Sequence, residues 1–214
     1  MAQQARAIAT REAILRSAGA VFGDVSYATA TLSDVISQAG VTQGALYFHF
    51  DSKLDLAQEV IRQQHELSMK AAGRFAEQTR PALDALVLLS GELARQITTE
   101  PVVRGGLRLT TESGQLFPEH SQGPYIDWIQ STEHFLRRAA DEGSVSGAMN
   151  FPGMARYIIS AFTGVQVVSR SLTGWADFTE RLQEMWQLQL PLILDSGSMA
   201  EVGRLAQLVT VRRA

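Results

Sequence analysis

Apolar residues recur at the spacing of an α-helix along nearly the whole of this 214-residue chain. The stripes are separated by stretches rich in Gly, Pro, Ser and Asn, notably residues 111–124 and 142–153. The strict polar–apolar alternation of a half-buried strand does not occur in the sequence. These patterns predict an all-α fold. The expected helices cover about 14–25, 31–39, 42–50, 52–71, 81–98, 101–109, 125–141, 153–172, 178–194 and 199–211.

The composition is that of an ordinary folded protein. Hydrophobic residues make up 45% and charged residues 19%, with a net charge of −3. A general polyanion binder would be strongly basic, so any nucleic-acid binding has to come from a local site. The absence of cysteine excludes disulfides and thiolate metal sites and fits a cytoplasmic protein. No apolar run is long enough to cross a bilayer, and no signal-peptide order opens the sequence, so we expect no membrane contact.

Two short helices near the N-terminus carry clear boundary signals. Thr31 and Asp34 have the spacing of a capping box, which opens the first helix. Gly40 is expected to end that helix in a left-handed conformation, and Thr42 is expected to cap the second one. Ser52 then precedes a longer helix. Two short helices joined by three residues have the dimensions of a helix-turn-helix.

The second short helix has one face for the core and one for a partner. Leu46 and Phe50 are four residues apart and are expected to face inward, which turns Gln43, Gly44 and Tyr47 outward. Glycine permits a close approach, a tyrosine hydroxyl can reach a phosphate oxygen, and the first turn of the helix offers free N–H groups. This arrangement predicts insertion into the DNA major groove. Geometry alone also fits a core helix pair without a DNA role.

Residues 31–57, "TLSDVISQAGVTQGALYFHFDSKLDLA", resemble the DNA-binding segment of the tetracycline-repressor (TetR) family. The resemblance implies a three-helix DNA-binding domain over residues 1–51 and a helical ligand-binding and dimerisation domain over residues 52–214. It also implies a homodimer that binds double-stranded operator DNA. Many relatives carry lysine where this chain has Gln43, an amide that can pair with adenine, so the operator cannot be copied from them. The DNA-binding residues implied are Thr42, Gln43, Gly44, Ala45, Tyr47, His49 and, on a backbone phosphate, Lys53.

Residues 100–113, "EPVVRGGLRLTTES", and 124–130, "PYIDWIQ", resemble segments of the γ-butyrolactone autoregulator receptors, a TetR subgroup. The implied function is a repressor that a γ-butyrolactone or butenolide releases from its operator, without any cofactor. In that subgroup the tryptophan at position 128 lines the ligand pocket. From the residues alone, Trp128 could equally be an ordinary core side chain.

Three polar residues on apolar helical stripes are further ligand candidates. Gln64 lies on the apolar face of its helix, and Thr163 and Gln166 lie three apart in a helix that is apolar nearly all round. A buried amide or hydroxyl needs a hydrogen-bond partner, which a lactone could supply. Bonds to core backbone or a dimer contact satisfy the same need. By resemblance, the last two long helices, including Trp186, form the dimer interface.

The same residues bear on other functions. His65 and Glu66 begin an HExxH zinc motif, but Met69 stands where the second histidine is needed, so the sequence does not predict an enzyme. One alternative is a TetR-type regulator of an efflux or catabolic gene that responds to a different apolar ligand. Another is a helical ligand-binding protein without DNA binding, which the balanced charge of residues 1–53 would permit.

Overall fold

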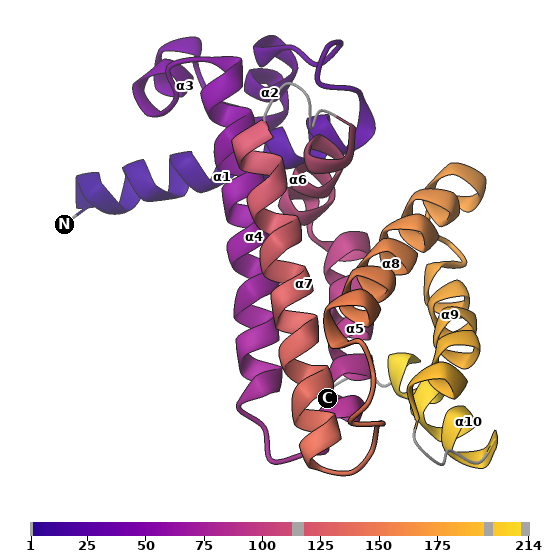
Figure 1. Ribbon diagram of the computed structural model, residues 1–214. Helices are drawn as coiled ribbons and strands as arrows, with labels where there is room; N and C mark the ends of the chain where they lie inside the picture. The colour runs from indigo at the N-terminus through magenta and orange to yellow at the C-terminus, as the bar shows by residue number, and fades with distance from the viewer. Residues whose placement is uncertain (1, 113–117, 195–198, 211–214) are drawn as a thin grey trace. The chain divides into compact units, whose positions relative to one another are not determined.

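The computed structural model describes residues 2–112, 118–194 and 199–210, and these residues form α-helices, one short 3₁₀ helix and no β-strand (Figure 1). The all-α prediction is confirmed. The helices are α1 (Ala2–Asp24), α2 (Leu32–Ala39), α3 (Gln43–His49), α4 (Lys53–Ala76), α5 (Ala82–Thr99), α6 (Pro101–Glu112), α7 (Pro118–Asp141), α8 (Phe151–Thr173), α9 (Phe178–Ile193), α10 (Met199–Gln207) and the 3₁₀ helix η1 (Leu208–Thr210).

The boundaries of α2 are those that the sequence signals predict. Thr31 Oγ1 accepts a hydrogen bond from the Asp34 N–H at 3.1 Å, and the Asp34 carboxylate accepts one from the Thr31 N–H at 3.0 Å. The hydrogen bonds that the Asp34 carboxylate accepts from the Thr31 hydroxyl and from the Thr31 N–H lower the pKa of this carboxyl below its ordinary value. Gly40 ends the helix with a φ of 64°, in the left-handed region.

Contacts divide the chain into two compact units, residues 1–68 with 96–124 and residues 69–95 with 125–214. This division does not follow the expected boundary between residues 51 and 52. The cause is α6, which packs on α1 although it lies about eighty residues downstream. A contact of that kind leaves no local trace in the sequence, because α6 has the same apolar periodicity whichever helix it covers.

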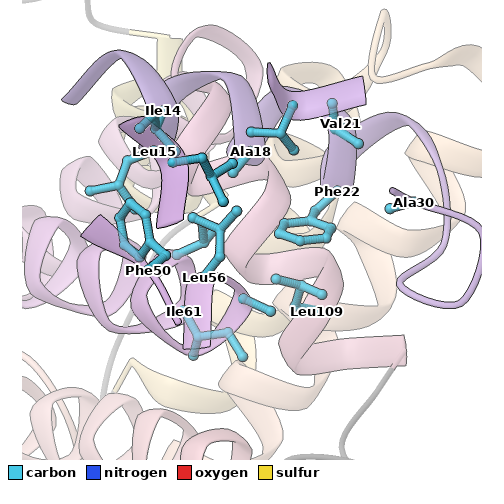
Figure 2. Packing of buried hydrophobic residues seen from close by; sticks show 14 residues of the cluster. Ile14, Leu15, Ala18, Val21, Phe22, Ala30, Phe50, Leu56, Ile61 and Leu109 are labelled. Carbon is cyan, nitrogen blue, oxygen red and sulfur yellow. The ribbon is translucent and has the colours of Figure 1, made fainter. Parts of the chain in front are cut away.

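The core of the first unit is a cluster of apolar side chains from α1, the helix-turn-helix, α4 and α6 (Figure 2). Phe22 of α1 and Leu46 of α3 are fully or nearly fully buried, and Leu109 of α6 is 1% exposed in the same cluster. The remaining members are Ile14, Leu15, Ala18, Val21, Ala30, Val35, Phe50, Leu56, Ala57, Val60 and Ile61. The helix-turn-helix is therefore held by apolar contacts that α6 completes.

The second unit contains the end of α4, α5 as far as Arg95, α7 from Tyr125 onward, and α8 to α10. In it Arg138 of α7 donates hydrogen bonds to the carbonyl oxygens of Ala76 and Arg80, at 2.6 and 3.2 Å. One prediction was wrong here: α7 begins at Pro118 rather than at Tyr125 and runs through Pro124. The Gly–Pro pair at 123–124 predicts a helix break, whereas the helix continues through both residues.

Candidate functional site

Helix α3 is fixed by its cap and by two buried side chains. Thr42 Oγ1 accepts a hydrogen bond from the Ala45 N–H at 3.2 Å, which satisfies one of the free donors of the first turn. Leu46 is fully buried and Phe50, which follows the helix, is 2% exposed. The predicted inward face is confirmed, and it sets the rotation of the whole helix about its axis.

The opposite face of α3 lies open, as predicted. Gln43 and Gly44 are exposed, and Tyr47 is 47% exposed. A side chain added at Gly44 would meet no atom within 4 Å, so the glycine leaves free space for a close partner. Ala45 and His49 are half-buried at the flanks of this face. A surface of this shape, a capped helix with polar and aromatic side chains outward, can enter a groove of DNA.

Phe48 also belongs to this surface, although it is not among the DNA-binding residues predicted from the sequence. Its side chain is 78% exposed, and its ring lies edge-on to that of His49 with the centroids 5.0 Å apart. A phenyl ring has no hydrogen bond to offer, but it can contact a thymine methyl group in the major groove. The sequence did contain a signal for Phe48, namely its position beside Tyr47. Two adjacent aromatic residues on a short capped helix are more than the core can bury, so at least one of them is expected to face outward.

Lys53, at the start of α4, has an intramolecular partner. Its Nζ donates a hydrogen bond to the carbonyl oxygen of Ala30 at 2.7 Å and lies 4.4 Å from the centroid of the Tyr27 ring. The lysine thus holds the segment before α2 against α4. A phosphate contact by Lys53 would have to share this ammonium group, which has three donors.

A charged network joins α1 to α4 below this surface. Glu59 pairs with Arg62 on its own helix and with Arg11 of α1. Hydrogen bonds from Arg62, assisted by Arg11, lower the pKa of the Glu59 carboxyl. The Arg11 guanidinium also lies 5.4 Å from the centroid of the Phe50 ring. Arg11 is therefore engaged within the protein, while Arg6 and Arg16 are exposed.

The four predicted ligand residues fall in two units. Gln64, in the first unit, is 2% exposed; its Nε2 lies 3.5 Å from Ser68 Oγ, and its buried Oε1 has no partner among the described residues. Trp128, in the second unit, is half-buried, with the Tyr125 ring edge-on at 5.2 Å. Thr163 is half-buried and Gln166 is 4% exposed, both on α8. The unpaired oxygen of Gln64 is the feature most expected of a ligand contact.

Helices α8 and α9 lie side by side (Figure 1). They border an apolar groove of about 410 Å³ in the second unit. Leu188, which lines it, is 77% exposed, and Leu172 and Leu192 are 68% and 64% exposed nearby. Trp186 was expected at the dimer interface, and this is corrected: its side chain is fully buried in the second unit. The exposed apolar face of α8 and α9 lies on the side of these helices opposite to the buried Trp186.

No three His, Cys, Asp or Glu side chains of the described residues are grouped closely enough to hold a metal ion. The described helices also include none that is both long and apolar enough to span a membrane.

A capped helix-turn-helix followed by a large helical body defines a class, and the chain belongs to the TetR family of bacterial regulatory proteins. The family model for these proteins matches residues 14–60, and the model for a tetracyclin repressor-like C-terminal domain matches residues 80–194. The chain is therefore a DNA-binding transcriptional regulator and not an enzyme. Its particular likeness within that family is to γ-butyrolactone receptors.

Three relatives carry that likeness. The A-factor receptor protein of Streptomyces griseus is 35% identical over 202 residues, which are 94% of this chain and 70% of that protein. The crystal structure of an ArpA-like γ-butyrolactone receptor matches with a TM-score of 0.83 and 30% identity, over 96% of this chain and 98% of that one. CprB from Streptomyces coelicolor, in complex with its biological operator sequence, matches with a TM-score of 0.79 and 31% identity, over 94% and 96% of the two chains.

Proposed function

We propose that this protein is a dimeric repressor that leaves its operator when it binds a small, mostly apolar signal, a γ-butyrolactone or butenolide. The observation that carries the proposal is the outward face of α3, where Gln43, Gly44 and Tyr47 are open while Leu46 and Phe50 anchor the helix. Likeness over nearly the whole chain to γ-butyrolactone receptors supports the class of ligand. Because its target is operator DNA, the protein would act in the cytoplasm.

In the proposed complex, α3 lies in the major groove. Gln43 reads a base edge, for which an adenine offers the matching donor and acceptor. Tyr47 and Lys53 hold backbone phosphates, and the capped first turn at Thr42 places Ala45 and Gly44 near the groove floor. His49 lies toward the phosphates at the far end of the helix. Residues 1–53 have no net charge, so affinity depends on these few contacts rather than on a basic surface.

Two such helices are needed to read an operator with two half-sites. We place the symmetric contact on the exposed apolar groove of α8 and α9, around Leu188 and Val168. The same patch on two copies is self-complementary about a two-fold axis. Covering Leu188, Leu172 and Leu192 removes apolar surface that a lone chain would leave in water.

Gln64, in the first unit, is a proposed ligand contact because its buried Oε1 has no partner among the described residues. Trp128, Thr163 and Gln166 are the proposed ligand residues of the second unit. Gln64 lies on the helix that begins at Lys53, eleven residues further along, which is roughly 16 Å at 1.5 Å per residue. A ligand seated at Gln64 can thereby tilt α4 and change the spacing of the two α3 helices. It must bind the DNA-incompetent state more tightly, because equal affinity for both states shifts nothing.

A gel shift tests the proposal, with DNA from upstream of the protein's own gene and a shuffled fragment as the control. We expect a retarded band on the upstream fragment alone, lost when a synthetic γ-butyrolactone is added. Binding that the lactone does not reverse would refute the ligand class but keep the DNA-binding role. Equal binding to the shuffled fragment would refute operator recognition.

A further inference from the structure

Helix α6 meets α1 without side chains between the two backbones. A Cβ atom on Gly105 would lie 2.3 Å from the carbonyl oxygen of Gly19, and one on Gly19 would lie 2.5 Å from the Cα of Val102. Real Cβ atoms do not come so close to backbone atoms, so the two helices can keep this distance only with glycine at both positions. The glycine pair therefore allows α1 and α6 to pack with their backbones in contact.

The next residue of α6 makes a similar contact with α4. A Cβ atom on Gly106 would lie 2.5 Å from the Cβ of Gln64 and 2.9 Å from the carbonyl oxygen of Val60. Adjacent glycines thus place α6 against α1 on one side and against α4 on the other. Close-packed interiors transmit displacement because they contain little free space. A displacement of α6 would therefore also displace α1 and α4.

Arg108, one turn further along α6, holds the end of α1. Its Nη1 donates a hydrogen bond to the carbonyl oxygen of Gly23 at 3.0 Å, and its side chain is only 13% exposed. Gly23 is in the last turn of α1, where carbonyl groups have no partner within the helix. Its missing side chain also makes room for the stem of Arg104, which a Cβ atom would meet at 3.1 Å. Arg108 acts as a C-terminal cap supplied by another helix.

The segment capped in this way leads directly into the helix-turn-helix. Residues 25–31 connect α1 to α2, and their far end is held by the hydrogen bond from Lys53 to Ala30. The connection is thus tied at each end by a cation that donates to a carbonyl oxygen: Arg108 of α6 at Gly23 and Lys53 of α4 at Ala30. Loss of either tie frees one end of the connection.

We propose that α6 positions the helix-turn-helix for DNA, through the backbone contact of Gly105 with Gly19 and the cap that Arg108 places on α1. The inference rests on the operator binding proposed above and adds residues that do not touch DNA. Arg108 is a positioning residue: it acts on the angle at which α2 and α3 leave α1. Gly105 and Gly106 fix how closely α6 approaches α1 and α4, and so place Arg108 within reach of Gly23.

The test compares Arg108→Met, which keeps an apolar stem but removes the donors, with Arg108→Lys, which restores one donor. Glu112→Gln is the matched control, because it removes the ion-pair partner of Arg108 and leaves the bond to Gly23. Operator affinity is measured by fluorescence anisotropy, and hydrogen exchange is followed at the amides of Val25 and Ala30, which bond to Val21 and Ser26. Hydrogen exchange is measured without DNA, so it reports the effect of losing the Arg108 cap even if the protein binds no operator.

We expect Arg108→Met to weaken operator binding by about five- to thirtyfold, the range of a coupling lost between elements. Its exchange at residues 25–30 should rise, Arg108→Lys should recover much of both, and Glu112→Gln should match the wild type. Gly105→Ala should weaken binding as well, whereas Gly73→Ala, at a helical glycine with nothing within 4 Å, should not.

Wild-type exchange at residues 25–30 in Arg108→Met would overturn the proposal. So would equal losses in Arg108→Met and Glu112→Gln, because the ion pair and not the cap would then explain them. Should the wild type bind no operator while Arg108→Met still speeds exchange, the operator proposal fails and the positioning of α1 by α6 stands.

Discussion

The indole N–H of Trp186 donates a hydrogen bond to the hydroxyl oxygen of Ser90 at 2.8 Å, inside the second unit. Helix α9 thereby faces α5 with its largest side chain and faces outward with Leu188 and Leu192. The two faces of α9 therefore have different surroundings. One belongs to the core of a single chain, and the other is the surface on which we place the partner.

Substitutions on those two faces should separate folding from assembly. Leu188→Arg should bring the mass in solution toward one chain and abolish operator binding, since losing an interface anchor costs about 2 kcal/mol or more. Met199→Arg, at an equally exposed apolar residue outside the groove, should stay dimeric. Light scattering coupled to size-exclusion chromatography measures this. A dimeric Leu188→Arg would place the interface elsewhere.

Trp186→Arg should unfold the second unit instead of dissociating a folded dimer. Truncating a buried tryptophan alone costs on the order of 3–5 kcal/mol, and an unpaired charge in its place adds to that. Chemical denaturation followed by circular dichroism should show the loss of stability in Trp186→Arg and not in Leu188→Arg at matched monomer concentration. A well-folded monomeric Trp186→Arg protein would contradict this.

Gln43→Ala should weaken operator binding by about 1–3 kcal/mol and relax the base preference at one position in each half-site. The physical reason is the loss of a bidentate amide contact at a base edge. Binding to a library of operators with single base changes measures it. Gln38→Ala, at an exposed glutamine of α2, is the matched control and should leave the base preference intact. An unchanged preference in Gln43→Ala would remove Gln43 from base reading.

Lys53→Met should weaken binding to all DNA sequences alike and reduce the slope of log affinity against log salt by about 1. One phosphate contact fewer releases one counterion fewer. Arg62→Met, which removes a cation of the same helix that pairs with Glu59 and Glu66, should leave the slope unchanged. A lower affinity with an unaltered slope would mean that Lys53 acts through Ala30 and not through a phosphate.

Trp128→Ala should leave operator binding intact but prevent release by lactone. Removing a large aromatic contact weakens ligand binding by about 1.5–3 kcal/mol without altering the α3 surface. A gel shift with and without lactone compares the variant with the wild type and with Trp175→Ala, at a half-buried tryptophan in the α8–α9 turn. Normal release by a folded Trp128→Ala protein would refute its role at the ligand.

Much of the DNA-binding segment could be predicted from the sequence. The cap at Thr31, the left-handed Gly40 and the cap at Thr42 join residues three or four apart, so short-range rules suffice. The inward Leu46 and the outward Tyr47 follow from helical geometry alone. The proposed ligand residues were less accessible, because an apolar stripe marks burial without saying whether core, ligand or partner covers it.

Most of the helices, their caps and the exposed face of α3 follow from the sequence alone, because each depends on residues that are neighbours along the chain. The starts of α1 and α7 do not follow from it. The contacts of Trp186 with Ser90, of Lys53 with Ala30 and of Gly105 with Gly19 become visible only in the folded chain. Those pairs are separated by 96, 23 and 86 positions respectively, as their residue numbers show. Helical periodicity states which side of a helix is buried, whereas the neighbour that buries it is selected by packing of the whole unit.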